Sequence, residues 1–158
     1  MPLSSRQPGH TENAMTMTNE RLDAMIREHA DAIHHSDLGR WQFDYYGHSV
    51  IVLTDEVHNR MRVMTPVGEA AAMDEELAME CLRANFDRAL DARYAISGDY
   101  VWSAFIHPLS ELNVSQVVDA FNQVVSLAAT YGTSFTSGSL AFGHAEQDTS
   151  DEDDQTDG

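Results

Sequence analysis

Two short turn sequences separate three strand-like stretches in the first half of the chain. Arg40–Tyr46 alternates aromatic with polar residues, a period of two that is typical of a strand with one buried face. Ser49–Thr54 is rich in β-branched residues on both faces, and Asn59–Met64 alternates again. Because Gly47-His48 and Asp55-Glu56 are too short for a crossover connection, successive strands must run antiparallel. The sequence therefore predicts an antiparallel three-stranded meander.

Three amphipathic stretches predict helices around this meander. Apolar residues recur at helical spacing in Asn19–His35, Met73–Leu90 and Val114–Tyr131. The third stretch follows Asn113 and contains Gln116, a pair spaced as in a capping box. We therefore expect this last helix to begin directly after Asn113.

Two further strands are predicted between the second and third helices. Ala92–Ser97 and Tyr100–His107 are strand-like and meet at the turn Gly98-Asp99. The predicted order of elements is α-β-β-β-α-β-β-α. The predicted fold class is α+β, with a five-stranded antiparallel sheet and helices packed on one face.

Composition divides the chain into one folded body with two polar ends. The chain has 158 residues, of which 42% are hydrophobic, enough for one core. Residues 1–18 are predicted to form a flexible N-terminal arm, and residues 19–143 a single α+β domain that ends in a Ser/Thr/Gly-rich extended strap. Residues 144–158 carry seven acidic residues and no large apolar one, so they are predicted to be a disordered acidic tail.

The charge of the chain excludes several classes of function. The formal net charge is −17, and all nine basic residues are Arg. A chain this acidic is not expected to bind nucleic acid or an anionic membrane surface. No apolar segment typical of a signal peptide is present, so the cytoplasm is the expected location. Two explanations of the acidity stay open: adaptation to high salt or a GC-rich genome, and a surface that steers a partner.

The sequence offers few candidates for catalysis or metal binding. The single cysteine, Cys81, lies in the apolar stripe of the second predicted helix, where core packing is the expected role. Glu28, Asp31 and His35 would share one face of the first predicted helix beside His34, but no metal-binding motif accompanies them. Four further carboxylates, which lie on strands or turns, form no recognisable pair: Asp44, Asp55, Glu56 and Asp99. No catalytic, cofactor-binding or metal-binding residue is therefore predicted.

The large apolar residues of the predicted strands suggest an interaction surface. A single layer of helices covers one face of a sheet, so the other face must meet solvent, a second subunit or a ligand chain. Large apolar side chains left on that face would mark a site of interaction. The candidate partner or dimer surface comprises Trp41, Phe43, Tyr45, Met61, Tyr100 and Trp102. The alternative is that these side chains point toward the helices as core.

Two segments resemble a known family. One is Leu82-Arg83-Ala84-Asn85-Phe86, followed by Arg93-Tyr94-Ala95-Ile96 and the turn at Gly98-Asp99. The other runs from Trp102 through Pro108-Leu109 to the Asn-capped last helix. With the order of elements, they resemble the class I type III secretion chaperones, the Tir chaperone (CesT) family, and the related YbjN-like domains. The resemblance implies a secretion-chaperone-like homodimer without a catalytic site, which holds a client segment in extended form along apolar grooves.

Three hypotheses about function follow. The first is a non-enzymatic, chaperone-like module that binds a client protein and needs no cofactor. The second is a YbjN-like regulatory or stress-related protein without a secreted client. The third is a small-molecule-binding domain or small enzyme with a pocket between sheet and helices.

Overall fold

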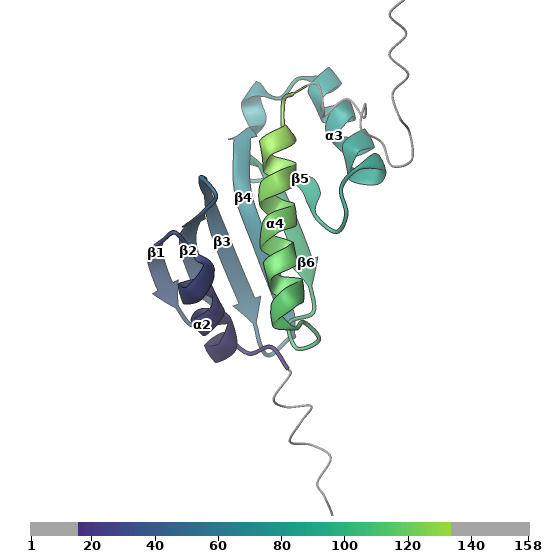
Figure 1. Cartoon of the computed structure of the whole chain (residues 1–158). Helices are drawn as coiled ribbons and strands as arrows, with labels where there is room; N and C mark the ends of the chain where they lie inside the picture. Colours follow the sequence, from purple (N-terminus) through teal and green to yellow (C-terminus); the bar gives the residue numbers. More distant parts are fainter. Residues whose placement is uncertain (1–15, 134–158) are drawn as a thin grey trace, which may run out of the picture.

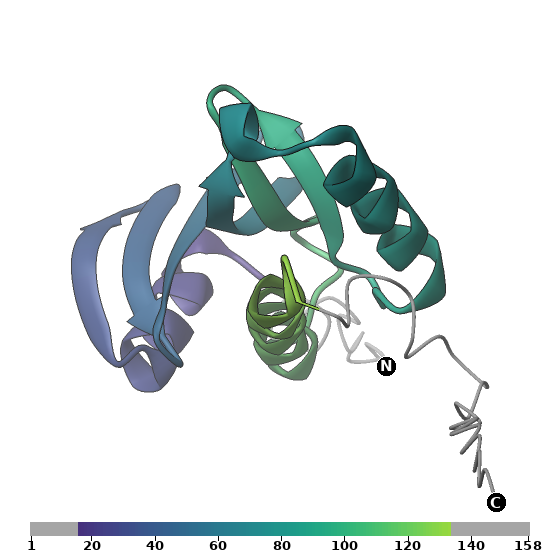
Figure 2. The ribbon, with the colours of Figure 1, turned by 90° about the horizontal axis from the view of Figure 1, so that it is seen from above.

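The computed structural model describes residues 16–133, which form one antiparallel sheet with three α-helices (Figure 1). The sheet has six strands in the order β1-β2-β3-β4-β6-β5. In chain order the elements are α2 (Asn19–His29), β1 (Ala32–Asp37), β2 (Arg40–Tyr45), β3 (His48–Asp55), β4 (Arg60–Glu69), the 3-10 turn η1 (Ala70–Ala72), α3 (Glu75–Asp87), β5 (Arg93–Ser97), β6 (Tyr100–His107) and α4 (Val114–Thr130). Helices α2 and α4 lie on the same side of the sheet, and α3 lies beyond its β5 end (Figure 2).

The predicted meander is present as β2, β3 and β4. Phe43 is paired with Val50, and Val52 with Val63, so alternate side chains of the three strands share one face. The β2–β3 turn contains Tyr46 and Gly47, both with positive φ, as the tightest antiparallel hairpins require. Turn geometry and the alternation of buried and exposed residues therefore fix the register of the predicted meander.

The first helix is shorter than predicted, and the sheet has six strands instead of five. Helix α2 begins after Thr18, whose side chain accepts a hydrogen bond from the Arg21 amide, and it ends at His29. The segment Ala32–Asp37, whose first four residues were predicted to belong to this helix, forms edge strand β1 beside β2. Ile33 is its only large apolar residue, so the local pattern could not distinguish strand from helix. The open edge of β2 supplies the hydrogen-bonding partners that decide the outcome.

Strand β4 extends beyond the predicted Asn59–Met64 and continues through Pro66 and Gly68. Its pairing with β3 stops at Met64, whereas its pairing with β6 continues to Glu69 past an irregularity between Pro66 and Gly68. Beyond Met64 no neighbouring strand on the β3 side needs the amide hydrogen that proline lacks. Pro66 is therefore tolerated where β4 has become an edge on that side.

The core lies between the sheet and the helices α2 and α4. Helix α4 begins with the predicted capping box, in which Asn113 and Gln116 bond each other's backbone amides. Phe121 of this helix is fully buried and meets Phe43 edge-on with ring centroids 5.3 Å apart. The buried hydroxyl of Ser103 on β6 donates to the carbonyl of Val124 at 2.8 Å, so this buried polar group is satisfied.

The two ends of the chain are described only in part. Met17, in the predicted N-terminal arm, is buried in the core, and Thr18 caps α2. The rest of that arm, nearly all of the predicted strap and the acidic tail lie outside the described residues. None of the helices within residues 16–133 is long and apolar enough to cross a membrane.

Candidate protein-binding surface

Four of the six residues predicted to form a partner surface belong to the core. Trp41, Phe43, Tyr45 and Met61 all lie on the sheet face that α2 and α4 cover, and all are buried. The Trp41 indole N–H donates to the Asp23 carboxylate of α2 at 3.0 Å. Trp41, Phe43 and Tyr45 also occupy the same face of β2, so their alternation identified a buried face correctly. The sequence did not reveal that helices cover this face.

Tyr100 and Trp102 lie on the opposite face of the sheet. Their rings meet edge-on with centroids 6.0 Å apart, and the Trp102 indole N–H donates to the carbonyl of Ser97 at 3.0 Å. Tyr100 is exposed and Trp102 is half-buried. No helix of residues 16–133 covers this face (Figure 2). We call it the uncovered face. Of the six residues predicted to form a partner surface, only Tyr100 and Trp102 lie on it.

Apolar side chains outside the predicted set extend this surface across the sheet. Strand register places Ile51, Met64 and Ala104 in one row on neighbouring strands. The next row holds Leu53 and Ile106, which flank Arg62. Ile51, Leu53 and Met64 are half-buried although no helix covers them, and Ile106 is 58% exposed. The uncovered face therefore has an apolar centre that spans β3, β4 and β6.

A shallow hollow lies at the end of this apolar centre. It measures about 300 Å³ and is lined by residues of β3, β4 and β6, among them Leu53, Arg60, Arg62 and Ile106. Apolar side chains therefore meet arginine guanidinium groups in the same depression. Thr54 and Asp55 also line the hollow, so groups of both charges border its apolar side chains. Its shallow shape suits a single side chain of a partner.

Helix α3 presents a second apolar surface. Its buried residues Cys81 and Ala84 face the core, whereas Met79, Leu82 and Phe86 recur on the opposite side of the helix. Phe86 is 90% exposed. Helical spacing alone would place Leu82 and Phe86 close to the apolar stripe of Cys81, but the helix lies at the sheet edge and buries only a narrow face.

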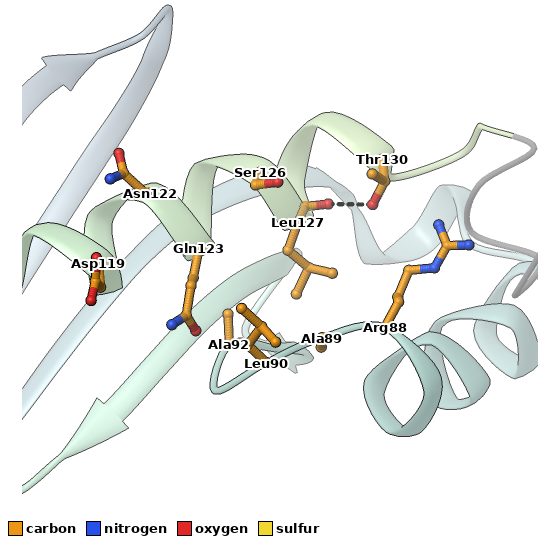
Figure 3. Close-up of a pocket in the computed structure, with 10 residues that line it drawn as sticks. All are labelled: Arg88, Ala89, Leu90, Ala92, Asp119, Asn122, Gln123, Ser126, Leu127 and Thr130. Carbon is orange, nitrogen blue, oxygen red and sulfur yellow. Dashed lines mark hydrogen bonds between the residues drawn. The ribbon is translucent and has the colours of Figure 1, made fainter. Parts of the chain in front are cut away.

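Another groove lies between α4 and the segment that joins α3 to β5 (Figure 3). It measures about 500 Å³. Several polar side chains that line it are already engaged. The Asn122 amide oxygen accepts from the Tyr45 hydroxyl, Gln123 bonds Asp91, and the Thr130 hydroxyl donates to the carbonyl of Leu127. The Arg88 side chain differs, because its Nε and Nη2 atoms are buried without a hydrogen-bond partner among residues 16–133. The small-ligand hypothesis therefore stays open at this groove.

Histidines pair with aspartates on or beside the uncovered face. His34 lies 2.9 Å from Asp44, His35 lies 3.0 Å from Asp37, and His58 lies 2.7 Å from Asp55. His34 and His35 belong to β1, so the helical face predicted to join them with Glu28 and Asp31 does not exist. No group of three or more potential metal ligands converges within the described residues.

Cys81 is buried, as the sequence predicts. Burial, and secondarily the negative charge of Glu80, raise the pKa of its thiol to about 11. A thiol with so high a pKa is almost entirely protonated near neutral pH, and the protonated form is a poor nucleophile. Cys81 therefore contributes to packing.

Comparison with known proteins identifies the fold. No protein-family model and no curated protein matches the chain. Solved structures do match, and three of them, each at probability 1.00 and low sequence identity, are described next.

The first is the HopA1–SchA chaperone–effector complex, with a TM-score of 0.53 and 10% identity over 70% of this chain and 88% of that one. The second is the Yersinia pestis type III secretion chaperone SycH with a fragment of YscM2, with a TM-score of 0.50 and 15% identity over 69% and 98%. The third is the ExsC–ExsE complex, with a TM-score of 0.54 and 13% identity over 80% and 95%. The chain therefore has a secretion-chaperone-like fold.

Proposed function

We propose that the chain is a non-enzymatic, chaperone-like module that holds a segment of a client protein on its uncovered face. The observation that carries this proposal is the apolar centre formed by Ile51, Leu53, Met64 and Ile106, which no helix of residues 16–133 covers. Contiguous exposed apolar surface on a soluble protein is typical of an interaction site. The similar structures support a protein partner, because one is a chaperone–effector complex and another a chaperone with a protein fragment.

An extended segment fits this surface better than a folded domain does. The exposed side chains stand in rows across strands about 4.8 Å apart, and the hollow between Leu53 and Ile106 admits single side chains. An extended chain presents alternate side chains to one side, so it can fill successive depressions while its backbone stays accessible. The client is therefore expected to lack its own fold in the bound segment.

The proposed module is a homodimer, and α3 is its proposed dimer surface. Met79, Leu82 and Phe86 form an exposed apolar stripe on this helix, and Ile96 of the adjacent edge strand β5 is also exposed. A second copy would cover the same residues on both protomers, as two-fold symmetry requires. This assignment leaves the uncovered face free for the client.

Affinity capture with matched variants tests client binding. Ile106→Asp places a charge in the apolar centre, whereas Val114→Asp places the same charge on the helix side of the sheet. Ile106 is 58% and Val114 52% exposed, so neither change disturbs the core. Asp at Val114 also suits the first turn of α4, because helix N-termini favour negative charge.

The wild type and Val114→Asp are expected to retain one stoichiometric protein from a native lysate, and Ile106→Asp is expected to lose it. Light scattering on the eluted complex gives the stoichiometry, and proteolysis of the isolated partner tests whether its bound segment is unfolded. Equal retention by both variants would refute the uncovered face as the client site. A wild-type protein that elutes without a stoichiometric partner would refute the chaperone proposal.

The dimer surface has a separate test. Phe86→Glu introduces a charge at a position that is 90% exposed in the single chain, so the fold of each protomer is expected to persist. Light scattering is expected to give twice the chain mass for wild type and for Val114→Asp, and a single chain mass for Phe86→Glu. A Phe86→Glu protein that stays dimeric would show that the copies meet elsewhere.

A further inference from the structure

The arginines of this acidic chain are concentrated on the uncovered face. Residues 16–133 contain eight Arg, and register places four of them on this face: Arg40, Arg60, Arg62 and Arg93. The other four lie on α2, on α3 or, for Arg88, directly after α3. The same residues carry 18 acidic side chains, so most of the surface is negative. The uncovered face is close to neutral instead, because register also places Asp37, Asp44, Asp55 and Glu69 on it beside the four arginines.

Three of these arginines have no partner in the described part of the chain. The guanidinium groups of Arg40, Arg60 and Arg62 make no ion pair or hydrogen bond with residues 16–133, and all three side chains are exposed. Arg93 differs, since it donates to the carbonyls of Leu90 and Ala92. Free guanidinium groups can form bidentate hydrogen bonds with an incoming carboxylate.

The carboxylates near these arginines are engaged by histidines. Asp37 lies opposite Arg40, and Asp55 lies opposite Arg60, yet their closest ionic contacts are with His35 and His58. Asp55 also accepts the backbone N–H of His58 at 3.1 Å. These two acids therefore make no ion pair with the guanidinium groups, which stay available to a partner.

Register interleaves these charges with apolar groups. Arg40, Leu53, Arg62 and Ile106 occupy one row on β2, β3, β4 and β6. Neighbouring members of the row lie about 4.8 Å apart, so the two arginines are separated by roughly 10 Å. A partner that lies on this row meets positive and apolar sites in alternation.

We infer that the uncovered face selects an extended client segment in which the side chains on the facing side, at every second residue, are acidic and apolar in turn. Its carboxylates pair with Arg62 and Arg40, and an apolar side chain enters the hollow between Leu53 and Ile106. This inference rests on the proposed function and adds the chemistry of the client. The negative charge elsewhere on the chain opposes an acidic client weakly, because physiological salt screens exposed charges beyond about 8 Å.

Two synthetic peptides of equal length test this preference. Both carry Leu at every fourth position, and two residues after each Leu one peptide holds Glu and the other Lys, with Ser at the remaining positions. In an extended chain, Leu and the charged residue then lie on the same side. Binding to the full chain is followed through Trp102 fluorescence, since Trp102 is half-buried on the uncovered face while Trp41 is fully buried. Two surface ion pairs predict that the Glu peptide binds about tenfold tighter than the Lys peptide near physiological salt.

Charge-reversal variants test whether Arg62 causes the preference for the Glu peptide. Arg62→Glu is expected to remove the tenfold advantage of the Glu peptide, and Arg21→Glu on α2 is expected to leave it within about twofold. The two variants change the net charge equally, and both side chains are exposed, so they separate a local contact from a general field effect.

Two results would overturn the inference. Equal or tighter binding of the Lys peptide would show that the arginines do not select acidic side chains. If Ile106→Asp still abolished binding in that case, client binding on the uncovered face would stand while the charge preference failed. Absence of binding by both peptides would show that the face does not accept such segments, as expected if residues 144–158 or a second copy of the chain occupy it.

Discussion

Asp23 joins three elements of the fold, and its removal gives a prediction of defined size. Its carboxylate accepts hydrogen bonds from the Trp41 indole at 3.0 Å, the Ser36 hydroxyl at 2.9 Å and the Arg27 guanidinium at 2.9 Å. The Arg27 pair is largely solvent-exposed and contributes only a few tenths of a kcal/mol. Trp41 is fully buried, so Asp23→Ala leaves its N–H without this acceptor at a cost of about 1–3 kcal/mol.

Together with the lost Ser36 bond, the expected decrease in unfolding free energy for Asp23→Ala is about 2–3 kcal/mol. For a fold of this size, that corresponds to a decrease in Tm of roughly 10 °C. Asp23→Asn keeps an acceptor oxygen for the indole and is expected to lose about 1 kcal/mol. Urea unfolding at one fixed protein concentration gives these values without interference from dimerisation.

The double variant Asp23→Ala/Trp41→Phe separates the indole bond from other effects. If the bond contributes as described, the two single changes are coupled by about 1 kcal/mol or more. An Asp23→Ala protein within about 0.5 kcal/mol of wild type would refute the reasoning. Equal losses for Asp23→Ala and Asp23→Asn would also refute it, because they would assign the effect to charge instead of the acceptor.

The same carboxylate predicts a pH dependence. The Trp41 hydrogen bond, followed by the Arg27 hydrogen bond, lowers the pKa of Asp23 below its ordinary value of 3.8. A carboxyl group with a lowered folded-state pKa stabilises the fold fully above the unfolded-state pKa, and this contribution is lost as the pH falls through the folded-state pKa. The stability difference between wild type and Asp23→Asn is therefore expected to shrink below about pH 4. A difference that stays constant to pH 2 would contradict this assignment.

Three further predictions concern packing, capping and thiol chemistry. Phe121→Ala is expected to lower the unfolding free energy by about 3–5 kcal/mol, whereas Phe86→Ala is expected to leave that of the dissociated protomer nearly unchanged. Equal losses in urea unfolding would contradict the assigned burial. Asn113→Ala removes the capping box of α4 and is expected to cost about 1 kcal/mol, which an unchanged thermal midpoint would refute. Cys81 is expected to react with an aromatic disulfide reagent near pH 8 only as fast as the chain unfolds, and rapid stoichiometric labelling of the native protein would contradict its burial.

Local sequence patterns predicted the central part of the fold well. The meander and the last helix each carry several apolar residues at one period, bounded by turn residues or a capping box, so local information sufficed. Strand β1 was missed because its formation depends on the open edge of β2, a long-range property. Only Ile33 in that strand carries a large apolar side chain, too little to distinguish a strand from the end of a helix.

The candidate surface was predicted less completely, and for a different reason. Alternation in Trp41, Phe43 and Tyr45 shows that one strand face is apolar, but not which face of the sheet the helices cover. The helices cover the face with the larger side chains, so these aromatics became core. Sequence signals for the uncovered face were the apolar residues on both faces of β3 and the alternate positions of Arg60 and Arg62.

Methyl NMR of the client complex tests the central claim most directly. The Ile and Met methyl groups of the full chain would be observed before and after addition of the protein retained in the capture experiment. Binding on the uncovered face predicts that the signals of Ile51, Met64 and Ile106 shift. The signals of Met25 and Ile26, which are buried residues of α2, are expected to stay in place. Shifts confined to Met79 on α3, with Ile51 and Ile106 unchanged, would contradict the account, because they would place the client on the helix surface and leave the sheet without its proposed role.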